Sequence, residues 1–282
     1  WLDALTNYLS ALNYPDTKDE LFKKFWPASI HLIGKDILRF HAVYWPAFLL
    51  AAKIKLPKKV YGHGWILSGE EKMSKSKGNI LDPLKIIEQY GLDPLRYYLI
   101  KEVSFGNDGN ISQERLEDCI NSDLANNYGN LCQRVFSFLN KNCMNKIPKS
   151  DYFTEDDKTL TNKLKNEVKN LNELINIQDL NTYIKQVIEF SFDSNKYFND
   201  LEPWSLKKTD PKKMNSVLYS IAEQIKNISI LLLPIIPISA NKILDIMNVN
   251  KELRVISEIN NNHGLNHDKE LRNIEILFKK VE

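Results

Sequence analysis

The feature that most constrains the fold is an apolar stripe at helical spacing in the second half of the chain. Its members recur every three or four residues, which places them on one face of an α-helix; they are Leu160, Leu164, Val168, Leu171 and Ile175. From Ser112 onward a helical pattern continues almost to the end of the chain. The sequence therefore predicts a helical bundle for this part.

Capping residues indicate where these helices begin. Ser112 can cap a helix that runs through Leu139, and Thr154 can cap the striped helix with Asp157 as its reciprocal partner. A last helix is expected over residues 239–247.

Asp-Pro pairs predict three further helix starts, at Asp82-Pro83, Asp93-Pro94 and Asp210-Pro211. In each pair the carboxylate can accept a backbone N–H bond of the first turn, and the N–H that proline lacks has no helical partner there. Gly91 is expected to end the first of these helices, and Pro234 cannot continue the last.

The first sixty residues read differently, as part of an α/β fold. Residues 29–33 form a short apolar run that predicts a buried strand, and Gly34 follows it. Residues 37–52 have helical spacing, and a second strand is expected over residues 60–67. This order of strand, glycine turn, helix and strand predicts a parallel sheet. The expected fold class of the chain is therefore α/β followed by all-α.

Composition narrows the function classes. The 282 residues are 43% hydrophobic and 26% charged with only 10 Gly and 11 Pro, which excludes disordered and collagen-like chains. The net charge of +2 means that any nucleic-acid contact must be a local patch. Three cysteines without a CxxC pair exclude a disulfide framework and a Cys-rich zinc site, and indicate a reducing cytoplasm. No run is long enough to span a membrane.

The sharpest local motif is Lys-Met-Ser-Lys-Ser-Lys-Gly-Asn at residues 72–79. Lysine ammonium groups suit phosphate oxygens, and a loop that closes over a triphosphate can stabilise the charge that develops on leaving pyrophosphate. Taken alone, such a cluster is more often a solvated surface loop.

Five segments in order resemble the methionyl-tRNA synthetases, a family of class I aminoacyl-tRNA synthetases. They are residues 1–8, 31–41, 61–66, the KMSKS signature at 72–76 and Leu-Glu-Pro-Trp at 201–204. The resemblance implies that residues 1–60 are the second half of a Rossmann-type nucleotide-binding domain. Residues 61–115 would be a small stem-contact segment with the KMSKS loop, and residues 116–282 an α-helical anticodon-binding domain.

The resemblance assigns most of the chemistry to matched positions. Lys75 would stabilise the transition state of methionyl-adenylate formation, with Lys72 assisting. The other ATP-binding positions would be Gly34, Asp36, His63, Gly64, Ile66, Ser74 and Ser76. The methionine side chain would be held by Trp1, Ala4, Tyr8, Ile37 and His41. ATP would enter with Mg²⁺, for which no protein ligand is assigned.

Each assignment has a structural alternative. Asp36 could be a helix cap, His63 a turn histidine, and Tyr8, Ile37 and His41 ordinary core residues. His31 is interpreted as structural, and no cluster has the spacing of metal ligands, so no metal site is expected.

In the bundle, the resemblance implies that Asn130, Arg134 and Trp204 read the anticodon of tRNA-Met. Asn130 and Arg134 are four residues apart and share a helix face. An unpaired base can stack on an aromatic ring and be hydrogen-bonded on its Watson–Crick edge. The alternative is a solvated polar face for the first two residues and a core anchor for Trp204.

One departure from the family is informative. The His-x-Gly-His signature of the catalytic domain is absent, since no two of the five histidines have that spacing. With Trp1 rather than Met at position 1, we expect the chain to be the carboxyl-terminal part of such an enzyme, without its amino-terminal half and any zinc knuckle there, and inactive alone. Two alternatives stay open: a class I synthetase for cysteine, isoleucine or valine, and a stand-alone tRNA-binding module without catalysis.

Overall fold

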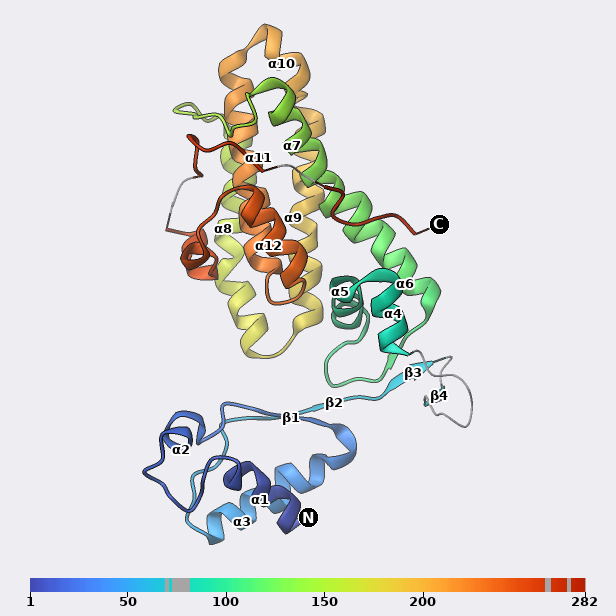
Figure 1. Ribbon diagram of the computed structural model, residues 1–282, viewed down its shortest axis with the longest axis vertical. Helices are drawn as coiled ribbons and strands as arrows, with labels where there is room; N and C mark the ends of the chain where they lie inside the picture. Colours follow the sequence, from blue (N-terminus) through green and yellow to red (C-terminus); the bar gives the residue numbers. More distant parts are fainter. Residues whose placement is uncertain (69–70, 73–81, 262–264, 273–274, 282) are drawn as a thin grey trace. The chain divides into compact units, whose positions relative to one another are not determined.

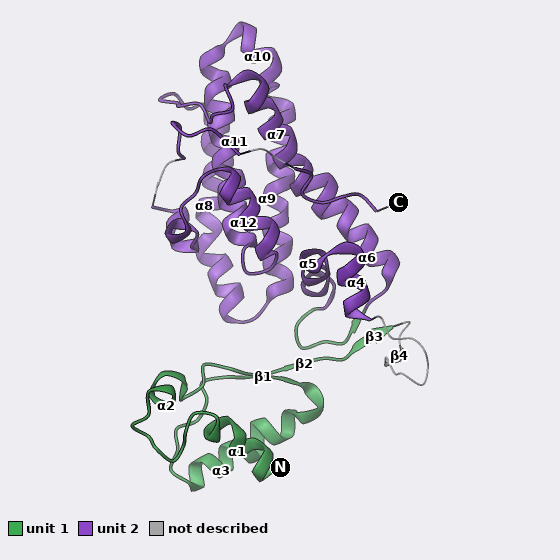
Figure 2. Cartoon of the chain, viewed as in Figure 1, with its two compact units in different colours: residues 1–73, 104–110 green, residues 74–103, 111–282 purple. Residues whose placement is uncertain are grey.

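The computed structural model describes residues 1–68, 71–72, 82–261, 265–272 and 275–281. The chain divides into two compact units, residues 1–73 with 104–110 and residues 74–103 with 111–282 (Figure 2). In these described ranges no helix is both long and apolar enough to cross a membrane.

The first unit is an α/β piece in which two parallel strands are joined through helix (Figure 1). Its elements are α1 (Leu2–Ser10), α2 (Glu20–Phe25), β1 (His31–Gly34), α3 (Trp45–Ala51) and β2 (Val60–His63). Between β1 and α3 the chain forms a 3₁₀ turn, Lys35–Ile37, and a π-helical turn, Phe40–Tyr44. The predicted strand–helix–strand unit with parallel strands is therefore confirmed. Its second strand ends at His63, so the strand expected over residues 60–67 was too long, and Ile66–Ser68 belongs to a separate sheet.

The core of this unit lies between its helices and one face of β1. It contains Leu5, Leu9, Trp26, Trp45 and Leu49. The prediction of a buried strand holds for only one face of β1. His31 and Ile33 are buried, whereas Leu32 between them is 60% exposed. Successive side chains of a strand point to opposite faces, and only one face of β1 meets the helices.

A second small sheet extends the first unit. β3 (Ile66–Ser68) pairs antiparallel with β4 (Glu71–Lys72) and parallel with β5 (Gly109–Asn110). β5 is formed by the segment that follows α5 in the sequence, so this segment returns to the sheet after the helix.

The second unit is helical, as predicted (Figure 1). Its helices are α4 (Pro83–Tyr90), α5 (Leu92–Glu102), α6 (Gln113–Cys119), α7 (Asn130–Asn142), α8 (Glu155–Asn176), α9 (Leu180–Asp200), α10 (Pro203–Thr209), α11 (Pro211–Leu232) and α12 (Pro237–Ile246). α11 is the central helix, packed against α7, α8, α9, α10 and α12. From Val217 to Leu232 it is buried on nearly every side, which explains its apolar composition.

Most predicted helix starts are confirmed by their capping bonds. The Asp82 carboxylate accepts from the N–H of Leu84, and the Asp210 carboxylate accepts from that of Lys213. Ser112 caps α6 in the same way. Thr154 and Asp157 form the reciprocal capping box at the start of α8.

Three boundary predictions need correction. α5 begins at Leu92 rather than after Asp93, because Gly91, at φ 92°, turns the chain directly from α4 into α5. α12 begins at Pro237 rather than at residue 239. The predicted helix from Ser112 to Leu139 is helical throughout, but a π-helical segment, Ile120–Gly129, separates α6 from α7.

Candidate functional site

Three of the predicted methionine-binding residues are joined by hydrogen bonds in the first unit. The Tyr8 hydroxyl lies 2.9 Å from Nε2 of His41, and Nδ1 of His41 lies 3.0 Å from the carbonyl oxygen of Ile37. Because a carbonyl can only accept, a neutral His41 donates from Nδ1 and accepts the Tyr8 hydroxyl proton at Nε2. This network fixes the imidazole, which is buried.

Trp1 adds a further aromatic ring beside Tyr8 and His41. Its ring stacks on Phe40, with centroids 3.8 Å apart, and meets the edge of the His41 ring at 6.5 Å. Ala4 is exposed on α1, one turn before Tyr8. Sequence reasoning did not single out Phe40, although its position beside His41 in an aromatic-rich segment was an available signal. A polarizable thioether can pack favourably against aromatic rings of this kind.

His31 has a structural role next to this group, as predicted. Trp45 donates its indole N–H to Nε2 of His31 at 3.3 Å, and the Tyr8 ring lies 4.4 Å away. Because an indole N–H can only donate, Nε2 of His31 is unprotonated and accepts this hydrogen bond. Burial, and secondarily His41, lower the pKa of His31.

Three of the predicted ATP-binding residues meet at the carboxyl ends of β1 and β2. Gly34 is the register partner of His63. A Cβ atom on Gly34 would come 2.5 Å from Oδ1 of Asp36 and 3.8 Å from Cε1 of His63. Asp36 is exposed and makes no capping bond to the turn that contains it, so the alternative of a helix cap was wrong. This edge can therefore present a carboxylate and an imidazole to one ligand.

Gly64 has a packing role that the sequence did not reveal. A Cβ atom there would lie 2.1 Å from the carbonyl oxygen of Asn107, so the backbone of the 104–110 segment excludes any side chain. Next to this contact, the Asp108 carboxylate accepts from Nζ of Lys35 at 2.5 Å and from the N–H of Trp65 at 2.8 Å. The hydrogen bond from Lys35 is the largest cause that lowers the pKa of Asp108. Ile66, the remaining predicted ATP-binding residue within the described ranges, is 37% exposed on β3.

The predicted catalytic segment lies mostly outside the described residues. Ser74, Lys75 and Ser76 belong to the undescribed range 73–81. Lys72 ends β4, and its side chain is outside the described part.

Two of the predicted anticodon-reading residues are brought together by a phenylalanine of a third helix. Nη2 of Arg134, on α7, donates to Oδ1 of Asn199, on α9, at 2.6 Å. The Arg134 guanidinium lies 5.2 Å from the ring centroid of Phe198, and the Trp204 ring meets the same ring edge-on at 5.9 Å. Trp204 is 45% exposed, so it is not a core side chain.

Asn130, the third predicted residue of this group, is the first residue of α7 and lies one turn before Arg134. The contacts described for the chain include none that join Asn130 to Arg134 or to Trp204.

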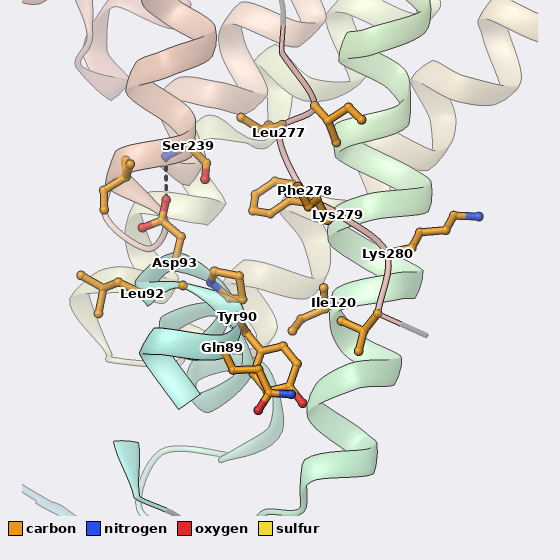
Figure 3. Close-up of a pocket in the computed structure, with 15 residues that line it drawn as sticks. Gln89, Tyr90, Leu92, Asp93, Ile120, Ser239, Leu277, Phe278, Lys279 and Lys280 are labelled. Atoms are coloured by element: carbon orange, nitrogen blue, oxygen red, sulfur yellow. Dashed lines mark hydrogen bonds between the residues drawn. The ribbon is translucent and has the colours of Figure 1, made fainter. Parts of the chain in front are cut away.

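Other regions of the described structure offer less chemistry. In the ranges that the structure describes, no three His, Cys, Asp or Glu side chains lie close enough to hold a metal ion. A cavity of about 610 Å³ lies between the α4–α5 junction, the start of α12 and residues 276–281 (Figure 3). None of the predicted site residues lines it.

Comparisons with known proteins agree along the whole chain. A family described as "tRNA synthetases class I (M)" matches residues 1–136, and one described as "Anticodon binding domain of methionyl tRNA ligase" matches residues 147–282. The methionine–tRNA ligase of Brucella suis is 46% identical over 92% of this chain and 50% of its own length. That of Rickettsia conorii is 45% identical over 100% of this chain and 56% of its own length.

The Mycobacterium tuberculosis methionyl-tRNA synthetase, solved in complex with methionyl-adenylate, superposes with a TM-score of 0.93 at 39% identity. The match covers 99% of this chain and 55% of that one. The chain thus spans about half the length of the relatives it matches. Its two parts match in the order and fold expected, so the chain belongs to the methionyl-tRNA synthetase family of class I synthetases.

Proposed function

We propose that this chain is the carboxyl-terminal part of a methionine–tRNA ligase. The complete enzyme would join methionine to ATP, release pyrophosphate, and transfer the methionyl group from the adenylate to tRNA-Met. The observation that carries the proposal is the similarity over 99% of the chain to a synthetase whose structure holds methionyl-adenylate.

For methionine, we propose the cluster of Trp1, Tyr8, Ile37 and His41, with Ala4 at its edge. The support is the hydrogen-bonded Tyr8–His41 pair and the stacked ring of Trp1, which together present aromatic surface to a thioether.

For ATP, we propose that Asp36 accepts hydrogen bonds from the ribose hydroxyls, while His63, Gly64 and Ile66 lie against adenosine. Gly34 contributes the turn between β1 and Asp36. Ligands of open α/β sheets bind beyond the carboxyl ends of the strands, and Gly34 and His63 end β1 and β2. Lys75, assisted by Lys72, Ser74 and Ser76, would bind the phosphates of Mg²⁺–ATP.

For tRNA, we propose that Trp204 stacks on an unpaired anticodon base while Arg134 and Asn130 hydrogen-bond to base edges. The half-exposed Trp204 ring and the hydrogen-bonded Arg134 guanidinium support this role.

We further propose that residues 1–60 complete a Rossmann-type domain, that residues 61–115 form the stem-contact segment, and that residues 116–282 bind the anticodon. The proposed site of action is the cytoplasm, where cysteines such as the free Cys119, Cys132 and Cys143 stay reduced.

Two measurements on the purified chain test this function. Binding of tRNA-Met should exceed binding of the same tRNA with a changed anticodon by at least about tenfold, which corresponds to the loss of one stacked base. Methionine-dependent exchange of pyrophosphate into ATP should stay at background, because the His-x-Gly-His segment is not among the 282 residues. Equal binding of the two tRNAs would refute the anticodon role.

A further inference from the structure

Phe198 is the residue that physically connects Arg134 and Trp204. Its ring carries the Arg134 guanidinium on one side at 5.2 Å and meets the Trp204 ring at 5.9 Å with an interplanar angle of 76°. A third ring, Phe138 on α7, meets it edge-on at 6.3 Å. The residues of this cluster come from α7, α9 and α10, so the contacts exist only when the three helices are packed.

The burial of Phe198 makes it suited to hold other side chains but not to bind a base itself. Phe198 is 2% exposed, whereas Trp204 beside it is 45% exposed. A cation over a ring face is attracted by the negative face of the π system, and an edge-to-face pair is attracted by the same charge distribution. Both contacts therefore depend on the ring electrons of Phe198 and not only on its volume.

We propose that Phe198 is a positioning residue for tRNA recognition, which orients Arg134 and Trp204 toward one nucleotide and couples their contributions. This inference rests on the proposed anticodon role of those two residues. Phe198 does not touch the tRNA. When the ring is removed, Arg134 keeps its bond to Asn199 but loses its cation–π partner, and the Trp204 ring loses its edge-to-face partner.

Coupling through Phe198 has a measurable signature. If both residues depend on the same ring, the combined loss of affinity in the double variant Arg134→Gln with Trp204→Ala should differ from the product of the two single losses by about twofold or more. In a Phe198→Leu background the combined loss should equal that product.

The test measures the affinity of the full 282-residue chain for tRNA-Met by fluorescence anisotropy, together with the thermal unfolding of each variant. Phe198→Leu should weaken binding by about 2- to 30-fold. Phe190→Leu is the matched control, because Phe190 is also buried on α9, eight residues earlier, and has no described contact with Arg134 or Trp204. This control should bind tRNA-Met as the unchanged chain does.

A second replacement separates ring electrons from folding. Pentafluorophenylalanine at position 198 keeps the shape of the ring but reverses its charge distribution, so it should weaken binding without lowering the unfolding temperature by more than the Phe190→Leu control does. Unchanged affinity in this variant, or additive losses in the presence of Phe198, would overturn the inference. If Trp204→Ala itself leaves tRNA binding unchanged, the proposed anticodon site fails. If Trp204→Ala weakens binding and Phe198→Leu matches Phe190→Leu, only the positioning role fails.

Discussion

The Asp93 carboxylate, in the first turn of α5, accepts a hydrogen bond from the backbone N–H of Ser239, in the first turn of α12 (Figure 3). Oδ2 of Asp93 lies 2.6 Å from the backbone nitrogen of Ser239, although the two residues are 146 positions apart in the sequence. The cap residue of α12, Ile236, makes no side-chain capping bond, so Asp93 supplies an acceptor from another helix. A carboxylate also suits the positive end of the helix dipole.

Replacing Asp93 should therefore destabilise the second unit. Asp93 is 3% exposed, and Asp93→Ala leaves the Ser239 N–H without its acceptor, so we expect the free energy of unfolding to fall by about 1–3 kcal/mol. Asp93→Asn should cost less, because an amide oxygen can still accept. Urea unfolding measures both, with the exposed Asp151→Ala as a control expected within about 0.5 kcal/mol of the unchanged chain. A loss no greater in Asp93→Ala than in the control would contradict the capping role.

The same aspartate shows what the sequence could and could not predict about the fold. Caps whose partner lies within three residues, such as Asp210 with the N–H of Lys213, were predicted correctly, because the local sequence contains both partners. Asp93 has the same local pattern, but its partner belongs to a helix 146 residues away. Capping potential is a local property, whereas the choice between two helix ends is made by tertiary packing.

The same distinction between local pattern and tertiary packing applies to the residues of the candidate site. Tyr8, Ile37 and His41 were identified from the family resemblance, and the structure joins them by hydrogen bonds. Phe198 could not be identified, because a buried phenylalanine on an amphipathic helix resembles any other core residue until α7 and α10 pack against it. The family resemblance assigned Gly64 to ATP binding, whereas its close contact with Asn107 becomes visible only in the folded structure.

Gly64 and Gly62 should differ in their tolerance of a methyl group. In Gly64→Ala the new Cβ would stand 2.1 Å from the carbonyl oxygen of Asn107, a backbone atom, so the segment must move and the first unit should lose several kcal/mol of stability. In Gly62→Ala the nearest atom is a Leu38 methyl at 3.4 Å, an ordinary contact. Thermal unfolding of the two variants checks this, and equal unfolding temperatures would contradict the close approach.

The stability of the first unit should depend on pH through His31. Burial, with a smaller effect of His41, lowers the pKa of His31 in the folded state, whereas the unfolded residue titrates near its ordinary value of about 6.5. Below that value the unfolded chain binds the proton first, so this contribution to stability is complete above about pH 6.5 and is lost as the pH falls toward the folded pKa.

Unfolding temperatures at pH 7.5 and pH 5.5 measure this effect. His31→Gln keeps an acceptor for the Trp45 indole but cannot take the proton, so its decrease between the two pH values should be smaller than that of the unchanged chain. Ser29→Ala changes an exposed residue two positions before His31 and leaves every histidine in place, so it should keep the full decrease. A decrease that is the same in His31→Gln as in the unchanged chain would assign the pH dependence to other groups.

In the complete enzyme that we propose, Lys75→Ala should lower the rate of adenylate formation far more than the affinity for methionine. A charged contact made mainly in the transition state appears in kcat, and on the scale of other oxyanion stabilisers its loss costs about 2–4 kcal/mol. Pyrophosphate exchange gives kcat and KM together. Lys77→Ala removes a lysine from the same segment and should have a smaller effect on kcat. A change confined to the KM for methionine would rule out the proposed role of Lys75.

Trp204→Ala should damage tRNA recognition and leave adenylate formation nearly intact. If the ring carries an anticodon base, its loss removes stacking of about 1–3 kcal/mol, which lowers kcat/KM for tRNA charging by about 5- to 150-fold. Because the ring is 45% exposed, the unfolding temperature should fall far less than for truncation of a core aromatic residue. Phe192→Ala removes an aromatic ring of similar exposure, 46%, from α9 and should leave tRNA charging unchanged. Normal charging by Trp204→Ala together with a large fall in unfolding temperature would show that the ring serves the packing of α10 against α9 and not the tRNA.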